Sequence, residues 1–226
     1  MSQASETETE ARPASGAAVI RWQGLRLELL PERALWEPSS GLLLLADVHL
    51  GKAEAFQASG VPLPSDGDLT NLNRLLTLAH ALRPKRVVVL GDLIHSRLGL
   101  TGELRQKLRA LPALLGCPLQ LIGGNHEAGS WLEGLPAEPP QAEGGLWLSH
   151  EPMRPPSADL LNVCGHLHPV ALLGRGGDRL RLPCFALDRS RAQLQLPAFG
   201  RLTGGHPCDP ALQRWVIAEQ QVLALP

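Results

Sequence analysis

Five apolar runs of strand length recur along this chain, and each is followed at once by a polar residue in a turn context. They are LLLLA before Asp47, VVVLG before Asp92, LQLIGG before Asn125, LWLS before His150 and LLNVCG before His166. Continuous apolar runs of this length are typical of strands that are covered on both faces. They predict an α/β protein or a layered sandwich in which the sheets are deeply buried.

Two stretches near these runs show helical periodicity. Leucine and alanine at helical spacing predict a helix over residues 68–82, with Pro84 as its stop. Similar spacing predicts a second helix over residues 101–115, which Pro112 is expected to bend or end early. Strand, helix, strand, helix and strand are therefore expected in this order.

The flanking segments read as short strands. Residues 18–22 and 25–30 predict a hairpin, because a two-residue, glycine-containing joint separates them. After His168 the sequence changes to short apolar pairs separated by arginines. This pattern favours short strands in an opposite layer, with a closing pair of strands near residues 215–225.

A single domain over residues 17–226 is expected, because no repeat and no linker divides it. Residues 1–16 lack the basic opening and apolar core of a secretory signal and predict a disordered N-terminal tail.

Composition narrows the possible partners and the cellular location. Lysine plus arginine (21) nearly balances aspartate plus glutamate (22), so any polyanion must be recognised locally rather than by the field of the whole molecule. The four cysteines form no CxxC pair, which argues against a zinc knuckle or disulfide scaffold and fits a reducing cytoplasm. No apolar stretch approaches the ~20 residues needed to cross a bilayer, so no membrane association is expected.

The polar residues at the ends of the apolar runs are all of types that can bind a metal ion. They are Asp47, His49, Asp92, Asn125, His126, His150, His166 and His168. Residues just past the carboxyl ends of parallel strands converge on one crevice, so these positions can meet in space. Oxygen and imidazole donors without thiolate favour Mn²⁺, Fe or Zn²⁺.

The number of these donors exceeds what one ion can use, so two divalent ions are expected. Two ions ~3.5 to 4 Å apart can hold the attacking and leaving oxygens of a displacement at phosphorus and lower the pKa of a shared water towards ~7. The reaction predicted from these residues is phosphoester hydrolysis.

The ordered set DVH, GDLIH, GNHE, a lone histidine and GHLH resembles the calcineurin-like metallophosphoesterase superfamily. The resemblance implies a four-layered α/β/β/α sandwich and a bridging carboxylate, Asp92, between two metals. The implied ligands of one metal are Asp47, His49, Asp92 and His168. Those of the other are Asp92, Asn125, His150 and His166. His126 resembles the family's phosphate-contacting histidine and is the candidate general acid for the leaving oxygen.

Two further segments narrow the resemblance. DVHLGK, ending in Lys52, and LPAFGRLTGG, over residues 196–205, are similar to the ligase-associated DNA damage response endonuclease subfamily, PdeM. This implies a DNA repair nuclease that uses Mn²⁺ and has a repair ligase and a helicase as partners. One alternative is a phosphatase or phosphodiesterase that acts on a small metabolite or cyclic nucleotide. Another is a metal-binding scaffold without turnover.

Several residues keep two interpretations at this point. Lys52 either neutralises a substrate phosphate or is solvated. His95 is either a loop residue or a contact of the metal ligands, and Glu127 either orients an imidazole or faces water. The six arginines from Arg175 to Arg201 either track a nucleic-acid backbone or form the outward faces of edge strands.

Overall fold

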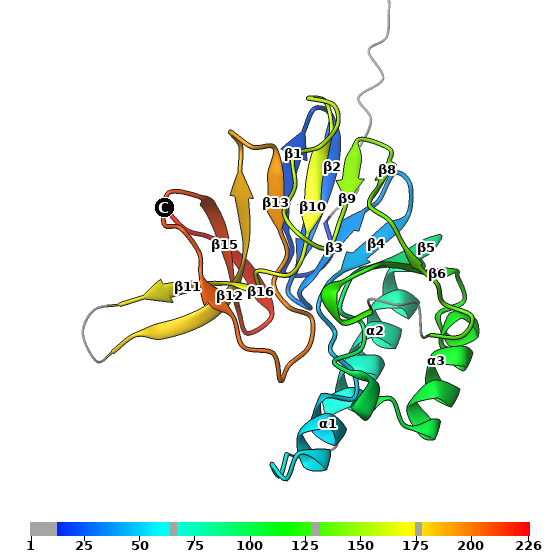
Figure 1. Ribbon diagram of the computed structural model, residues 1–226. Helices are drawn as coiled ribbons and strands as arrows, with labels where there is room; N and C mark the ends of the chain where they lie inside the picture. Colours follow the sequence, from blue (N-terminus) through cyan, green and yellow to red (C-terminus); the bar gives the residue numbers. More distant parts are fainter. Residues whose placement is uncertain (1–12, 64–66, 128–131, 175–177) are drawn as a thin grey trace, which may run out of the picture.

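The computed structural model describes residues 13–63, 67–127, 132–174 and 178–226 (Figure 1). Residues 1–12 of the predicted tail, and Arg175 of the arginine-rich stretch, lie outside this range. The backbone N–H of Ala14 donates to the Glu28 carboxylate at 2.9 Å, and the carbonyl of Gly16 accepts the N–H of Val222 at 2.8 Å. The residues just before the predicted domain start are therefore held against the domain.

The first sheet has seven strands in sequential order. They are β1 (Ala18–Trp22), β2 (Leu25–Leu30), β3 (Ala34–Glu37), β4 (Leu42–Leu45), β5 (Arg86–Leu90), β6 (Leu119–Ile122) and β7 (Ala137–Glu138). Strands β1 to β4 are antiparallel neighbours, whereas β4, β5 and β6 are parallel. The predicted hairpin is confirmed: Gln23 and Gly24 both have positive φ, as a two-residue primed turn requires.

Among the described residues, α2 (Gly67–Leu82) and α3 (Gly102–Leu115) lie beside the first sheet, and the short α1 (Lys52–Ala58) lies farther from the sheet, beyond α2 (Figure 1). The two predicted helices are confirmed as α2 and α3. The expectation that Pro112 bends or ends α3 early is wrong with respect to its end. This proline sits in the last turn, where it removes only one backbone donor, and the helix ends at a left-handed Gly116.

The second sheet is built from the strands that follow. They are β8 (Gln141–Glu143), β9 (Leu146–Leu148), β10 (Leu161–Cys164), β11 (Pro169–Leu173), β12 (Leu180–Asp188), β13 (Gln193–Gln195), β14 (His206–Pro207), β15 (Gln213–Ala218) and β16 (Gln221–Ala224). Strands β9, β10 and β13 are mutually parallel, in contrast to most of this sheet. The short strands expected after His168 and the closing pair are confirmed.

Alternate residues of the central strands face two different cores. Leu43 and Leu45 of β4 pack with the leucines of α2 and α3, whereas Leu42 and Leu44 pack with Val163 and other apolar residues of the second sheet. Burial on both faces explains why the runs are continuous rather than alternating.

The predicted α/β sandwich is confirmed in its two packed sheets and its helical layer. Within the described residues no α-helix follows Leu115, and the leucines of α2 and α3 pack on the first sheet.

Candidate metal centre

The topology brings two sets of strand ends together. The carboxyl ends of the parallel strands β4, β5 and β6 lead to the DVH, GD and GNH motifs. The carboxyl ends of β9 and β10 lead to His150 and to the GHLH motif. Side-chain contacts link the two sets, so all of the predicted ligands gather where these edges of the sheets meet.

Asp92 lies at the middle of this cluster. Its Oδ2 atom is 3.5 Å from Nε2 of His49, 3.5 Å from Nε2 of His150 and 3.6 Å from Nε2 of His126. Its Oδ1 atom accepts the backbone N–H of His126 at 3.1 Å. Burial would raise the pKa of Asp92, but the hydrogen bond with His49 and the charge of His150 outweigh it and lower the pKa to about 2. The carboxyl group is therefore ionised at neutral pH.

Asp47 forms a second contact point. Its Oδ1 atom is 3.1 Å from Nε2 of His168, and its Oδ2 atom accepts the N–H of His166 at 3.0 Å. The Asp47 Oδ1 and His168 Nε2 atoms are both shielded from solvent, yet among the described residues neither forms a hydrogen bond of normal geometry. Buried polar atoms are normally paired, so two adjacent unpaired donor atoms fit a bound cation.

The histidines are oriented by hydrogen bonds on their other ring nitrogen. Nδ1 of His150 lies 3.0 Å from the carbonyl oxygen of Leu90, so it carries the proton and leaves Nε2 free to face Asp92. Nδ1 of His166 is 3.2 Å from Nε2 of His150 and 3.4 Å from Nδ2 of Asn125. Asn125 is exposed and closes this side of the cluster.

The backbone is strained at these ligand positions. Positive φ angles of 55°, 51°, 49°, 66° and 45° occur at Asp47, His49, Asp92, His166 and His168. Non-glycine residues adopt this conformation rarely, and it costs of order 1 kcal/mol each. Strained backbone conformations of this kind are concentrated at functional sites, where contacts with the surrounding residues maintain them.

Close packing makes glycine necessary just before two ligands. A Cβ atom on Gly91 would lie 2.1 Å from Nδ1 of His150, and one on Gly165 would lie 2.5 Å from Oδ2 of Asp47. The glycines in the GD and GHLH motifs therefore allow side chains of the other strands to reach the cluster.

The model of the calcineurin-like phosphoesterase family matches residues 41–190, which is more than half of the chain. The chain belongs to this family. The superfamily predicted from the sequence is thereby confirmed, and with it a hydrolase class that acts on phosphoesters with divalent metals.

Among solved structures, the nuclease MPE of Pseudomonas putida is similar to this phosphoesterase, with a TM-score of 0.76 and 29% identity over 92% of this chain and 100% of that chain. A double mutant of Vps29 from Entamoeba histolytica covers 81% of this chain and 96% of its own, at 15% identity and a TM-score of 0.36. The comparison with curated proteins gave no match.

Glu127 has a role that neither of its two interpretations describes. It is buried, and its carboxylate accepts the backbone N–H groups of Asp92 at 2.9 Å, Ile94 at 3.0 Å and Gly124 at 3.2 Å. Burial raises its pKa, and these hydrogen bonds partly oppose the effect. Glu127 therefore fixes the backbone that carries Asp92, rather than an imidazole.

Thr203 is a site residue that sequence reasoning missed. Its Oγ1 atom is 3.1 Å from Nδ1 of His49. The segment 196–205 reaches this position because Phe199 and Gly200 donate backbone hydrogen bonds to the carbonyls of Ala46 and Asp47. The LPAFGRLTGG motif was noted in the sequence, but its alignment with the end of β4 is visible only in three dimensions.

His95 and Lys52 border the cluster. The His95 ring lies 5.2 Å from that of His126 and 5.6 Å from that of His49, and it stacks on Phe56. Burial, and next the charge of Lys52, lowers the pKa of His95 to about 4, so this ring is neutral. His95 thus contacts the predicted site, which decides between its two interpretations. Lys52 begins α1 half-buried, and burial lowers its pKa.

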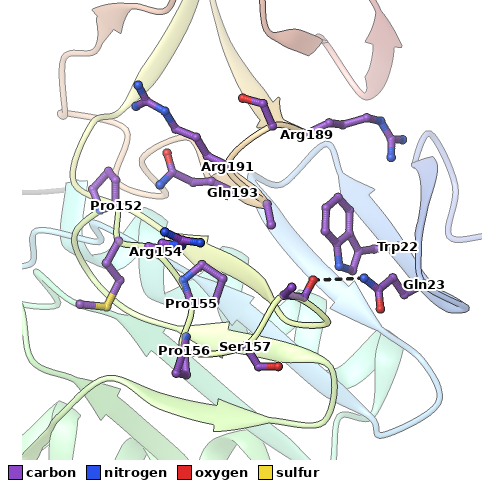
Figure 2. A pocket seen from close by; sticks show the side chains of 14 residues that line it. Trp22, Gln23, Pro152, Arg154, Pro155, Pro156, Ser157, Arg189, Arg191 and Gln193 are labelled. Carbon is purple, nitrogen blue, oxygen red and sulfur yellow. Dashed lines mark hydrogen bonds between the residues drawn. The ribbon is translucent and has the colours of Figure 1, made fainter.

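Four arginines of the stretch, Arg181, Arg189, Arg191 and Arg201, line cavities at different places on the molecule. Arg189 and Arg191 line one of about 1100 Å³ together with Trp22 and Arg154 (Figure 2). Its lining includes the residues just before β10 and β13, at the opposite strand ends from the metal ligands. Within the described residues, no helix is long and apolar enough to cross a membrane.

Proposed function

We propose that this phosphoesterase is a dinuclear, metal-dependent nuclease that hydrolyses phosphodiester bonds of DNA. The position of Asp92 supports the proposal of two metal ions, because one of its carboxylate oxygens lies within 3.6 Å of imidazoles from three different strand ends. The similarity to the Pseudomonas putida nuclease supports a nucleic-acid substrate.

The donors divide into two sets that share Asp92. The first set is Asp47, His49, Asp92 and His168. The second set is Asp92, Asn125, His150 and His166. Two divalent cations, for which we propose Mn²⁺, would supply Lewis-acid chemistry that neutralises charge on a phosphodiester and makes water more acidic. Fe and Zn²⁺ suit the same donors.

His126 is placed to act on the substrate itself. Its side chain is 36% exposed, and its Nε2 atom stays 3.6 Å from Oδ2 of Asp92. An imidazole at the open edge of the cluster can donate a proton to the leaving oxygen. Asn125, beside it, offers a neutral oxygen that leaves the site more positive for a phosphate, and Lys52 adds a cation at the rim.

The biological setting is proposed from the family resemblance. The DVHLGK and LPAFGRLTGG motifs support a role in DNA repair in the cytoplasm, with a repair ligase and a helicase as partners. The neutral net charge requires that DNA be held by local groups rather than by the whole molecule.

The direct test compares hydrolysis of single-stranded DNA, duplex DNA and a small bis-aryl phosphodiester with Mn²⁺, using Asp92→Asn as the inactive control. DNA cleavage should fall steeply between about 50 and 200 mM salt, while hydrolysis of the small ester should change little. Hydrolysis of small esters alone would favour the metabolite or cyclic-nucleotide enzyme. Metal binding without any turnover would favour the scaffold.

A further inference from the structure

A second cavity opens beside the metal centre, and we call it the arginine cavity. It has a volume of about 160 Å³, and its lining includes Arg33, Arg181, Arg201, His168 and Thr203. His168 is a proposed ligand, and Thr203 contacts the ligand His49. The cavity therefore lies next to the proposed catalytic centre.

The arginine cavity is positively charged and has no acidic side chain in its lining. Burial, and next the charge of Arg201, lowers the pKa of Arg33, which shows that these two guanidinium groups repel each other. In the part of the chain that the structure describes, no carboxylate forms a salt bridge with Arg33, Arg181 or Arg201. An anion in the cavity would relieve this repulsion.

The backbone holds two of these guanidinium groups in place. Arg33 donates to the carbonyl of Ala198 at 3.2 Å, and Arg181 donates to the carbonyl of Gly205. Each bond uses one of the five N–H donors of the group, so the remaining donors can bind another acceptor. Arginine presents these donors as a planar fork that matches the oxygens of a phosphate.

The size of the cavity indicates which part of a nucleic acid it accepts. Pockets for drug-sized molecules begin at about 300 Å³, and the arginine cavity is about half of that. This space suits one phosphate group and is too small for a nucleoside. We propose that the arginine cavity binds a second, non-reacting backbone phosphate of the nucleic-acid strand that is cleaved at the metal centre. This inference rests on the proposed nuclease function.

The test measures DNA binding in the presence of EDTA, so that binding at the arginine cavity is measured without metal-dependent cleavage. The variants are Arg181→Gln, Arg201→Gln and the double variant, and both side chains are exposed, so the fold should persist. The double variant Arg83→Gln/Arg105→Gln, at two exposed positions on the helical side of the molecule, is the charge-matched control. The cavity double variant should bind a labelled single-stranded oligonucleotide about tenfold more weakly, and the control should not. The slope of log K against log salt should fall by about 0.7.

Activity provides a second readout. With Mn²⁺, the cavity double variant should show a raised KM for single-stranded DNA and an unchanged kcat/KM for a bis-aryl phosphodiester, which has only one phosphate. Equal DNA affinity in the cavity double variant and in the Arg83→Gln/Arg105→Gln control would overturn the proposal. A parallel loss of aryl ester hydrolysis would also overturn it. A wild-type protein that cleaves no DNA would instead reject the nuclease function, while the binding comparison still decides on the cavity.

Discussion

At the candidate metal centre, the hydrogen-bond partner of one ring nitrogen determines which nitrogen of a histidine faces Asp92. His49 faces Asp92 with Nε2 because its Nδ1 atom is held by Thr203, and His150 does so because its Nδ1 atom donates to the carbonyl of Leu90. Such partners commonly fix the tautomer of a metal-binding imidazole. Thr203 is therefore a positioning residue, and its effect should appear in metal affinity.

Replacing Thr203 with valine keeps the shape of the side chain and removes the hydroxyl. We expect Mn²⁺ affinity, measured by calorimetric titration, to fall by roughly 10- to 100-fold. Thr203→Ser restores the hydroxyl and should bind Mn²⁺ nearly as well as the wild type. Equal affinities for the valine and serine variants would show that the contact with His49 is incidental.

His126→Ala should separate catalysis from metal binding. We expect kcat on a phosphodiester to fall by about 10² to 10⁴, because the leaving oxygen loses its proton donor. Mn²⁺ stoichiometry should stay unchanged, since His126 belongs to neither proposed ligand set. His80→Ala, on the exposed side of α2, is the matched control. Normal turnover of His126→Ala would remove its assignment as general acid.

Some site residues are readable from the sequence because they follow apolar runs directly. Asp92 and His166, each preceded by glycine at the end of a strand, are of this kind. Thr203 is not, because its contact with His49 spans 154 positions and depends on where β13 ends. Glu127 was visible in GNHE, but its backbone partners, such as Ile94, could not be read from sequence spacing.

At the scale of elements, the long helices α2 and α3 were predicted from their periodic apolar residues, and the short helix α1 was missed. Helix α1 has only seven residues, and its N-cap residue Gly51 offers no side-chain cap, so neither periodicity nor a capping residue in the sequence indicates this helix. The packing between α2 and the segment 196–205 was also unpredictable. The guanidinium of Arg74 on α2 lies 4.0 Å from the centre of the Phe199 ring and donates to the carbonyl of the same residue.

Removing the Arg74 side chain should weaken the packing between α2 and the segment 196–205. We expect Arg74→Ala to lower the free energy of unfolding by about 2 kcal/mol, from the lost cation–π contact and charged hydrogen bond. Urea denaturation of the metal-free protein measures the change, with Arg105→Ala as the surface control. Arg74→Lys should recover only part of the loss, because an ammonium group lacks the planar fork. A stability equal to that of the control would contradict the anchoring role.

Burial of the Asp68 carboxyl group on α2 makes stability depend on pH. The Asp68 carboxylate accepts the N–H of Gly51 at 2.6 Å, and burial raises the pKa of Asp68 from its usual 3.8 to about 6. The folded state therefore binds the proton more tightly than the unfolded state. The stability that this group contributes is present below pH 3.8 and is lost as the pH rises through 6.

Asp68→Asn should abolish this dependence. Compared with the wild type, the variant should gain on the order of 1 kcal/mol on going from pH 4 to pH 7, once solvent screening is allowed for. Urea denaturation of the metal-free protein at the two pH values measures the difference. Asp159→Asn is the control, because hydrogen bonding to Ser157 lowers the pKa of that exposed carboxyl. If stability changed between pH 4 and pH 7 by the same amount in Asp68→Asn as in the wild type, the assignment of this pH dependence to Asp68 would be refuted.

At the scale of the whole molecule, the arginine-rich stretch shows why sequence proximity misleads. Arg181 and Arg189 lie near opposite ends of β12, and a nine-residue strand is roughly 30 Å long. The two arginines consequently serve different cavities. The sandwich, by contrast, was predictable, because the continuous apolar runs indicate strands that are buried on both faces.

Seven side chains are proposed to hold two cations for phosphodiester hydrolysis. The most direct measurement titrates EDTA-treated protein with Mn²⁺ while following hydrolysis of a bis-aryl phosphodiester. We predict no turnover without metal and a rate that saturates at two equivalents per chain. Asp92→Asn should not reach this plateau. Turnover in the absence of metal, or full activity at one equivalent, would contradict the dinuclear centre.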